Sequence, residues 1–316
     1  MLRPLLSRHL VFRSVDIMKT KRFKTSLTAV LLALGLSSAA PILSAEGGVA
    51  EAPQTAEPRE YALERHTLHM GTLINAKLFG ATPEAVKHYA IVFEDKVTDY
   101  DDLMSVHKDT PLNEVNRRAG EPVEVPCEIA DMTKQALAIA DETNGAFEPM
   151  IGPVVNLWKI GFGGEHVPSD EAIAEAVSKV DRSKVRVWRE GGRCMMQIAK
   201  GQSIDMGAIA KGFIGQRLSD ILKHEGMTRG VLNLGGNIVA VGEKSAGRPW
   251  RIGIQHPAES RGGYFAVASV KDESVITSGA YERYFEENGK RYSHILDPKT
   301  GRPAKTDISS VTIICL

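Results

Sequence analysis

The stretch that decides the fold is SGAYERYFEENGKRYSHILDPKTGRPA, residues 278–304. Its Asn288-Gly289 pair is typical of a tight hairpin, because both central residues of such a turn need a positive φ. Pro298 to Gly301 predicts a second turn, with proline early and glycine late. We therefore expect a strand over 292–296, with His294 on it and Asp297 at its end. Polar groups beside loops are candidates for chemistry, and a plain half-buried histidine is the alternative.

The segments before and after this stretch mix helical and strand patterns. The α+β pattern predicts a single mixed α/β domain over residues 61–316, with a large, mostly antiparallel sheet flanked by helices. Within 66–80, Met70-Gly71-Thr72 interrupts the strand alternation, which indicates a bulge or a close approach. Helices are expected over 82–105, 128–145, 169–179 and 205–226, and a hairpin is expected to join KVRVW to MMQIA. After residue 226 come the β-like runs GVLNL, NIVAV, WRIGIQ, YFAVASV, SVITS and SSVTII.

The N-terminal region has the pattern of a secretory signal peptide. From Met18, four cations precede an apolar run over 27–36, and small residues follow to about Ala45. We therefore expect 1–45 to be an upstream extension plus signal peptide, 46–60 to be a linker, and the mature protein to be exported, to the periplasm or the outer face of the inner membrane. The 39 basic and 39 acidic residues give no net charge, so no bulk attraction to nucleic acid is expected.

Three cysteines, Cys127, Cys194 and Cys315, contain no CxxC pair, so a zinc or thioredoxin-like site is not supported. In an oxidising compartment at least one thiol stays unpaired. A bridge between Cys127 and Cys194 is one possible pairing, and the sequence leaves it open.

Three further segments carry glycines where a ligand could approach. In DMGAIAKG, Asp205 ends an expected strand and Lys211 falls in the first turn of a helix, whose N-terminus is suited to an anion. Gly235-Gly236 separates two β-like runs, and the apolar segment NGAFEPMIGPVVNLWKIGFG contains Glu148 as the acid of its first half. Each has a plainer interpretation, as an ordinary turn or a loop that covers the core.

Together these motifs resemble the ApbE family of FAD:protein FMN transferases. The resemblance runs over about 66–313 and rests on Met70-Gly71-Thr72 and on LMSVHKDTPLNEVN, GAFEPMIGPVVNLW, DMGAIAKG, NLGGN, TSGAYERYF and YSHILDPKTGRP, in family order. It implies a T-fold-like domain that binds FAD and Mg²⁺. It also implies transfer of FMN to a Thr or Ser hydroxyl of a target protein, with release of AMP. Such targets are flavoprotein subunits of membrane redox complexes and exported reductases.

The resemblance also implies roles for particular residues. His294 is similar to the family's base, Asp297 is expected to orient it or to help place the metal, and Lys211 with Mg²⁺ would neutralise the diphosphate. The carbonyl of Ala208 resembles a Mg²⁺ ligand, and His107 is expected to stack on a ring. The remaining expected FAD contacts are Met70, Ala146, Phe147, Glu148, Asp205, Lys211 and the backbone at Leu296.

Two departures from the family pattern stand out. Glu148 occupies a position where the family usually has Asp. The sequence ends at Cys315-Leu316, before the Ala-rich helix that carries the family's side-chain metal ligands, so those ligands and that helix are expected to be missing. An exported FAD-binding protein without transfer activity and an FAD pyrophosphatase are therefore the alternatives to the transferase.

Overall fold

A β-hairpin and its neighbours build the central sheet. The computed structural model describes residues 60–105, 108–259 and 262–316. Six strands lie in the order β1-β2-β6-β7-β10-β15, and each neighbouring pair is antiparallel. This arrangement confirms the expected α+β class with a mostly antiparallel sheet. The strands are β1 (Tyr61–His69), β2 (Thr72–Gly80), β6 (Gly230–Leu234), β7 (Asn237–Val241), β10 (Ser274–Gly279) and β15 (Ser310–Cys315).

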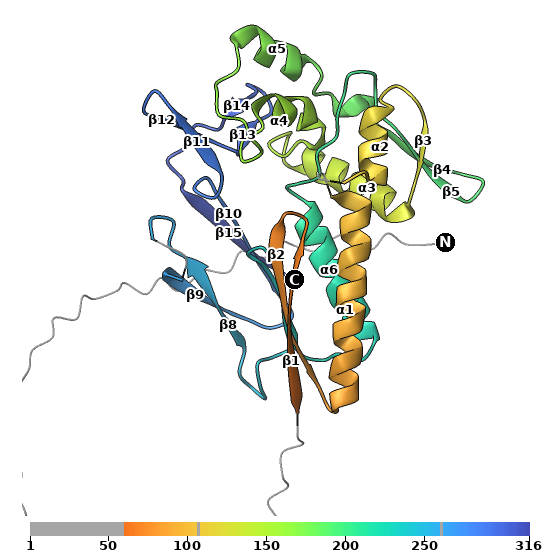
Figure 1. Cartoon of the computed structure of the whole chain (residues 1–316), viewed down its shortest axis with the longest axis vertical. Helices are drawn as coiled ribbons and strands as arrows, with labels where there is room; N and C mark the ends of the chain where they lie inside the picture. The colour runs from red at the N-terminus through yellow and green to blue at the C-terminus, as the bar shows by residue number, and fades with distance from the viewer. Residues whose placement is uncertain (1–59, 106–107, 260–261) are drawn as a thin grey trace, which may run out of the picture.

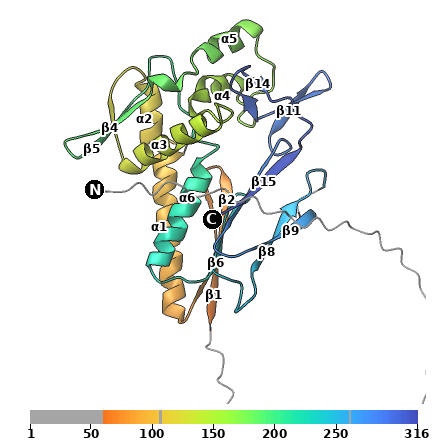
Figure 2. The same cartoon turned by 180° about the vertical axis from the view of Figure 1, so that it is seen from behind.

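Helices α1 (Pro83–Met104) and α6 (Ala210–His224) cover one face of this sheet side by side (Figures 1 and 2). The Oγ1 of Thr82 caps α1 by accepting the Ala85 amide. Apolar residues recur along α1 at three- and four-residue spacing and meet the buried face of β2 and β6. The main core therefore lies between these two helices and the sheet.

The hairpin of β8 (Trp250–Gln255) and β9 (Tyr264–Val270) packs against the opposite face of the sheet (Figure 1). Trp250 is the largest residue of this second core, and its indole Nε1 donates to the Val241 carbonyl at 3.2 Å. The sheet is thus buried on both faces over β7 and β10, which fixes the strands that lead into the 278–304 stretch.

The remaining elements gather beyond one end of the sheet. The three-stranded sheet β3-β5-β4 lies beside α2 and α3. A disulfide joins Cys127 to Cys194, which is the pairing that the sequence left open. Cys315 is a free thiol. The elements are α2 (Pro111–Arg117), β3 (Val123–Val125), α3 (Cys127–Glu142), η1 (Pro149–Ile151), α4 (Gly152–Trp158), α5 (Asp170–Ser178), η2 (Arg182–Lys184), β4 (Arg186–Glu190), β5 (Arg193–Gln197), β11 (Tyr284–Glu287), β12 (Lys290–Ser293), β13 (Leu296–Asp297) and β14 (Arg302–Pro303).

Local expectations for two glycine- and proline-rich segments were wrong. Met70-Gly71 is not a bulge inside one strand, because both residues have positive φ (51° and 66°) and form the two-residue turn between β1 and β2. The apolar 146–159 segment is not an irregular loop: it contains η1 and α4, since its prolines stand at first-turn positions, where a missing N–H costs nothing.

Two further strand expectations were also wrong. The expected strand over 292–296 is interrupted, because β12 ends at Ser293 and β13 begins at Leu296, which leaves His294 between strands. Asp205 does not end a strand, since β5 ends at Gln197 and an irregular segment leads on to α6. The two expected turns, at Asn288-Gly289 and around Gly301, are confirmed by their positive φ angles.

The expected signal peptide within 1–45 lies outside the described residues, as does the linker apart from Glu60. Among the helices of 60–105, 108–259 and 262–316, none is both long and apolar enough to cross a membrane.

Candidate functional site

His294 lies in the gap between β12 and β13. Its backbone amide and its ring Nδ1 both lie within hydrogen-bond distance of the Arg283 carbonyl oxygen, at 3.0 and 3.1 Å. A carbonyl can only accept, so Nδ1 carries the proton and Nε2 keeps its lone pair. Burial lowers the pKa of His294; the hydrogen bond to the Arg283 carbonyl opposes this shift, and the nearby charges of Arg283 and Lys211 add to it. His294 is therefore a neutral imidazole near pH 7, with Nε2 ready to accept a proton.

Arg283 holds this histidine and belongs to the turn between β10 and β11. Its guanidinium lies over the ring of Phe162, with 5.0 Å to the ring centroid. Gly161 makes this contact possible, since it has a φ of 81° and a Cβ there would lie 2.8 Å from the Arg283 Cδ. The sequence interpretation assigned no role to Arg283, although it falls within the TSGAYERYF motif.

Lys211 lies in the first turn of α6, as expected from the sequence. Burial lowers its pKa, and the neighbouring charge of Arg283 lowers it further, while Glu282 opposes the shift. Among the described residues, no carboxylate forms an ion pair with its ammonium. A half-buried cation at a helix N-terminus, beside Arg283 and His294, favours an anionic ligand, because both the side chain and the free amides attract negative charge.

The segments around Asp205 and Glu148 lie next to each other. The Asp205 amide donates to the Pro149 carbonyl at 2.8 Å, and the Asp205 carboxylate accepts the Gly207 amide at 2.7 Å. Burial raises the pKa of Asp205, and the Gly207 hydrogen bond opposes that shift. Gly152 allows the approach, since a Cβ there would lie 2.4 Å from the Ser203 carbonyl oxygen.

Glu148 is a buried carboxylate with partners on both oxygens. Oε1 accepts the Met150 amide at 3.1 Å and thereby caps η1, and Oε2 accepts Nη1 of Arg182 at 2.9 Å. In this structure the side chain of Glu148 positions its own segment. That segment presents Ala146 at the surface, while Phe147 packs partly against the main core.

Replacing Glu148 tests this arrangement. We expect Glu148→Ala to lower the free energy of unfolding by about 2 kcal/mol, because it removes a charge-assisted bond to Arg182 and leaves the Met150 amide without its acceptor. Glu148→Gln keeps the cap and should recover part of that loss. Urea denaturation of the wild type and the two variants measures the difference, and an alanine variant as stable as the wild type would contradict the assignment.

Met70 is held by a carboxylate that the sequence did not single out. Asp101, in α1, is 4% exposed and accepts the Met70 amide at 2.8 Å, His69 Nδ1 at 3.2 Å and Lys108 Nζ at 2.7 Å. Burial alone would raise the pKa of Asp101, but the bonds from Lys108 and the Met70 amide bring it below its ordinary value. The one sequence signal for Asp101 is its position on the otherwise apolar, buried face of α1, four residues after Val97 and three before Met104. His107, expected near this point, lies outside the described residues.

Three other predicted residues are placed as follows. The structure does not set Asp297 against His294: its Oδ1 accepts the Lys299 amide at 2.8 Å, and the Arg283 carbonyl takes the orienting position instead. Leu296 pairs with Pro303 and packs in the cluster around Trp158. Ala208 is exposed just before α6.

A magnesium ion finds few ligands in this arrangement. Within the described part of the chain, no three His, Cys, Asp or Glu side chains form a group that could hold a metal. The Ala208 carbonyl is a single oxygen, whereas Mg²⁺ takes six oxygen ligands, so these side chains alone do not fit the ion.

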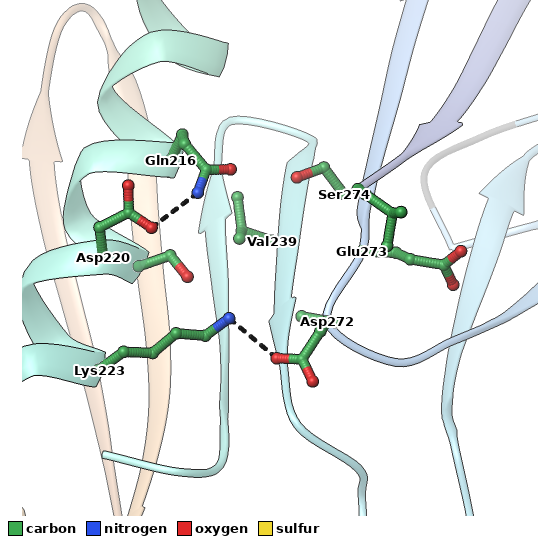
Figure 3. Close-up of a pocket in the computed structure, with 10 residues that line it drawn as sticks. Gln216, Asp220, Lys223, Val239, Asp272, Glu273 and Ser274 are labelled. Carbon is green, nitrogen blue, oxygen red and sulfur yellow. Dashed lines mark hydrogen bonds and ion pairs between the residues drawn. The ribbon is translucent and has the colours of Figure 1, made fainter. Parts of the chain in front are cut away.

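A cavity of about 420 Å³ lies away from these residues, between α6 and the strands β7 and β10 (Figure 3). Its lining includes an ion pair between Lys223 and Asp272 at 2.9 Å and a hydrogen bond from Gln216 to Asp220 at 2.8 Å. None of the predicted site residues lines it.

Comparisons with known proteins place the chain in a class. A protein of Treponema pallidum (strain Nichols) named FAD:protein FMN transferase is 37% identical over 281 residues, covering 84% of this chain and 77% of that protein. One of the same name from Salmonella typhimurium is 32% identical, covering 84% and 78%. The crystal structure of the ApbE protein of Thermotoga maritima superposes with a TM-score of 0.71 at 30% identity, covering 80% of this chain and 82% of that one. The fold and these relatives define an enzyme of the transferase class.

The family follows from the sequence profile. The ApbE family profile matches residues 70–315, which is most of the chain. This chain belongs to the ApbE family, as its motifs led us to expect.

Proposed function

We propose that this protein is an FAD:protein FMN transferase, which moves FMN from FAD to a Ser or Thr hydroxyl of a target flavoprotein and releases AMP. Relatives that are 37% and 32% identical carry this name. The observation that carries the proposal is the cluster of Lys211 and Arg283 beside a neutral His294. It combines a site for a diphosphate with a base.

The residues divide the reaction between them. The Nε2 of His294 takes the proton from the acceptor hydroxyl, whose oxygen attacks the phosphorus of the FMN half of FAD. The bond from that phosphorus to the bridging oxygen breaks, and AMP leaves with the bridging oxygen and its electron pair. Lys211, Arg283 and the free amides at the start of α6 stabilise the negative charge on the phosphates. Asp205 and the Ala146–Glu148 segment are proposed to contact FAD, as are Met70, Leu296 and His107. Asp297 fixes the turn after β13.

Location and metal dependence are parts of the same proposal. The Cys127–Cys194 disulfide supports an exported protein, in the periplasm or at the outer face of the inner membrane, because such bonds persist in oxidising compartments. The family resemblance supports a Mg²⁺ requirement with the Ala208 carbonyl as one ligand; since the described side chains do not complete the site, the other ligands would be oxygens of FAD and of water. Target flavoproteins of membrane redox complexes, or exported reductases, would meet the enzyme there.

To test this proposal, the protein comprising residues 46–316 is incubated with FAD, MgCl₂ and a purified flavoprotein subunit of a membrane redox complex. We expect FMN covalently bound to a Ser or Thr of the acceptor, detected by its mass, together with one AMP per FMN transferred. EDTA should abolish both products if Mg²⁺ is required. FMN and AMP formed without any acceptor would instead identify an FAD pyrophosphatase, and bound, intact FAD would identify a binding protein.

A further inference from the structure

We propose that a groove beside His294 binds an acidic stretch of the acceptor protein, next to the hydroxyl that receives FMN. This inference rests on the proposed function and names the kind of acceptor that the site takes. The groove has a volume of about 650 Å³. It lies between the β11–β12 hairpin, the segment from β14 to Ser309, and the end of β8–β9, and we call it the acceptor groove.

The acceptor groove adjoins the catalytic histidine. Ser293, the residue before His294, lines it, and so does Ala304, whose amide donates to the Ile295 carbonyl at 2.8 Å. Tyr281, close before Arg283 in the sequence, lines another side. The segment that carries the proposed base is thus flanked by groove residues, so a chain lying in the groove passes close to it.

The charge of the lining has one sign. Among the described residues, the groove lining contains no Asp or Glu, and it contains four cations: Lys290, Arg291, Arg302 and Lys305. Arg291 forms an ion pair with Glu286, and Arg302 forms one with Asp170; neither of these carboxylates lines the groove. Neither lysine has a carboxylate partner among the described residues, so both are available to an acidic ligand.

The shape and the apolar lining favour an extended polypeptide. Tyr281 and Tyr292 supply aromatic surface over the buried Trp158, and Lys290 lies 5.0 Å from the ring centroid of Tyr292. In its two-stranded sheet, β12 pairs with β11 alone, which leaves its second edge for main-chain hydrogen bonds. An extended segment with a central Ser or Thr and flanking carboxylates can pair with the free edge of β12, pack against the tyrosine rings and form ion pairs with the lysines.

The experiment measures binding without FAD, so that it stands apart from transfer. A fluorescein-labelled peptide with a central Thr flanked by Asp residues is titrated with the protein, and anisotropy reports the Kd. A second peptide has Asn in place of each Asp. We expect the Asn peptide to bind about tenfold more weakly, and the affinity of the Asp peptide to fall with added salt.

The charge-reversal variant Lys290→Glu/Lys305→Glu should weaken binding of the Asp peptide by at least about tenfold. It should bind a peptide with Lys in place of each Asp more tightly than the wild type does. Lys87→Glu/Lys134→Glu makes the same change of charge on α1 and α3, outside the groove, and should bind as the wild type does. FAD affinity should be unchanged in both variants.

Three results would overturn the inference: equal binding of the Asp and Asn peptides, no effect of the groove variant, or an equal effect of the control variant. A loss of FAD affinity in the groove variant alone would assign the groove to the nucleotide instead. Transfer by the wild type in the presence of FAD is measured separately, so the proposed function can hold when the groove assignment fails.

Discussion

Replacing His294 by Ala should lower the rate of FMN transfer by about a hundredfold to ten-thousandfold, the usual contribution of a positioned general base. The imidazole donates from Nδ1 to the Arg283 carbonyl, which leaves Nε2 to accept the hydroxyl proton. Alanine removes the base but leaves Lys211 and Arg283 in place, so FAD should still bind. The measurement is the single-turnover rate of acceptor labelling, with FAD affinity followed by flavin fluorescence.

The pH profile supplies the control for this variant. Burial lowers the pKa of His294 below the ordinary value of 6.5, so the neutral base is present at pH 7. The wild-type rate should fall only as the pH drops through this lowered pKa, because protonation then occupies Nε2. His294→Ala should lose that acidic limb. A variant that keeps both its rate and the limb would show that another group accepts the proton.

Removing the Cys127–Cys194 disulfide should lower the free energy of unfolding by about 4 kcal/mol. The bridge joins residues 67 positions apart, from the first residue of α3 to the second residue of β5, and a closed loop of that length restricts the unfolded chain strongly. The double variant Cys127→Ser/Cys194→Ser, compared with the wild type by urea denaturation, measures the effect.

Reduction gives a matched check on the same bond. Dithiothreitol should lower the denaturation midpoint of the wild type towards that of the double variant, and it should leave the double variant unchanged. Cys315→Ser removes a thiol that is free in the structure, so it should respond to the reductant as the wild type does. A wild type indifferent to dithiothreitol would argue against a stabilising bridge.

The sequence predicts the helices and the hairpins of this fold well, since their signals are local. Thr82 and Ser169 precede helices that they cap, and Asn288-Gly289 forms the expected turn. The misplaced strand over 292–296 has a different origin. The apolar pattern continues through His294, whereas the pairing with β11 ends there: the Arg283 carbonyl, opposite His294 in the β11–β12 register, accepts both its amide and its ring Nδ1.

Sequence motifs identified the candidate site residues, but they could not predict which of these residues lie close together in the fold. Lys211 lies close enough to Arg283 and His294 to affect their electrostatics because the start of α6 approaches the turn after β10, which no local pattern encodes. Asp101 and Arg283 were missed for the same reason, since each acts on a residue that is far away or through its backbone. The expected FAD contact of Glu148 stays a prediction; its two carboxylate oxygens accept the Met150 amide and the Arg182 guanidinium, and sequence alone did not indicate these partners.

The parts of the site come from widely separated positions along the chain, and this governs when activity can begin. Met70 lies in the turn between β1 and β2, Lys211 at the start of α6, and His294 between β12 and β13. Contacts of such high sequence separation depend on closing long loops, which costs conformational entropy. The proposed phosphate site and base therefore exist together only in the folded chain, so a change that unfolds any one of these segments should remove both.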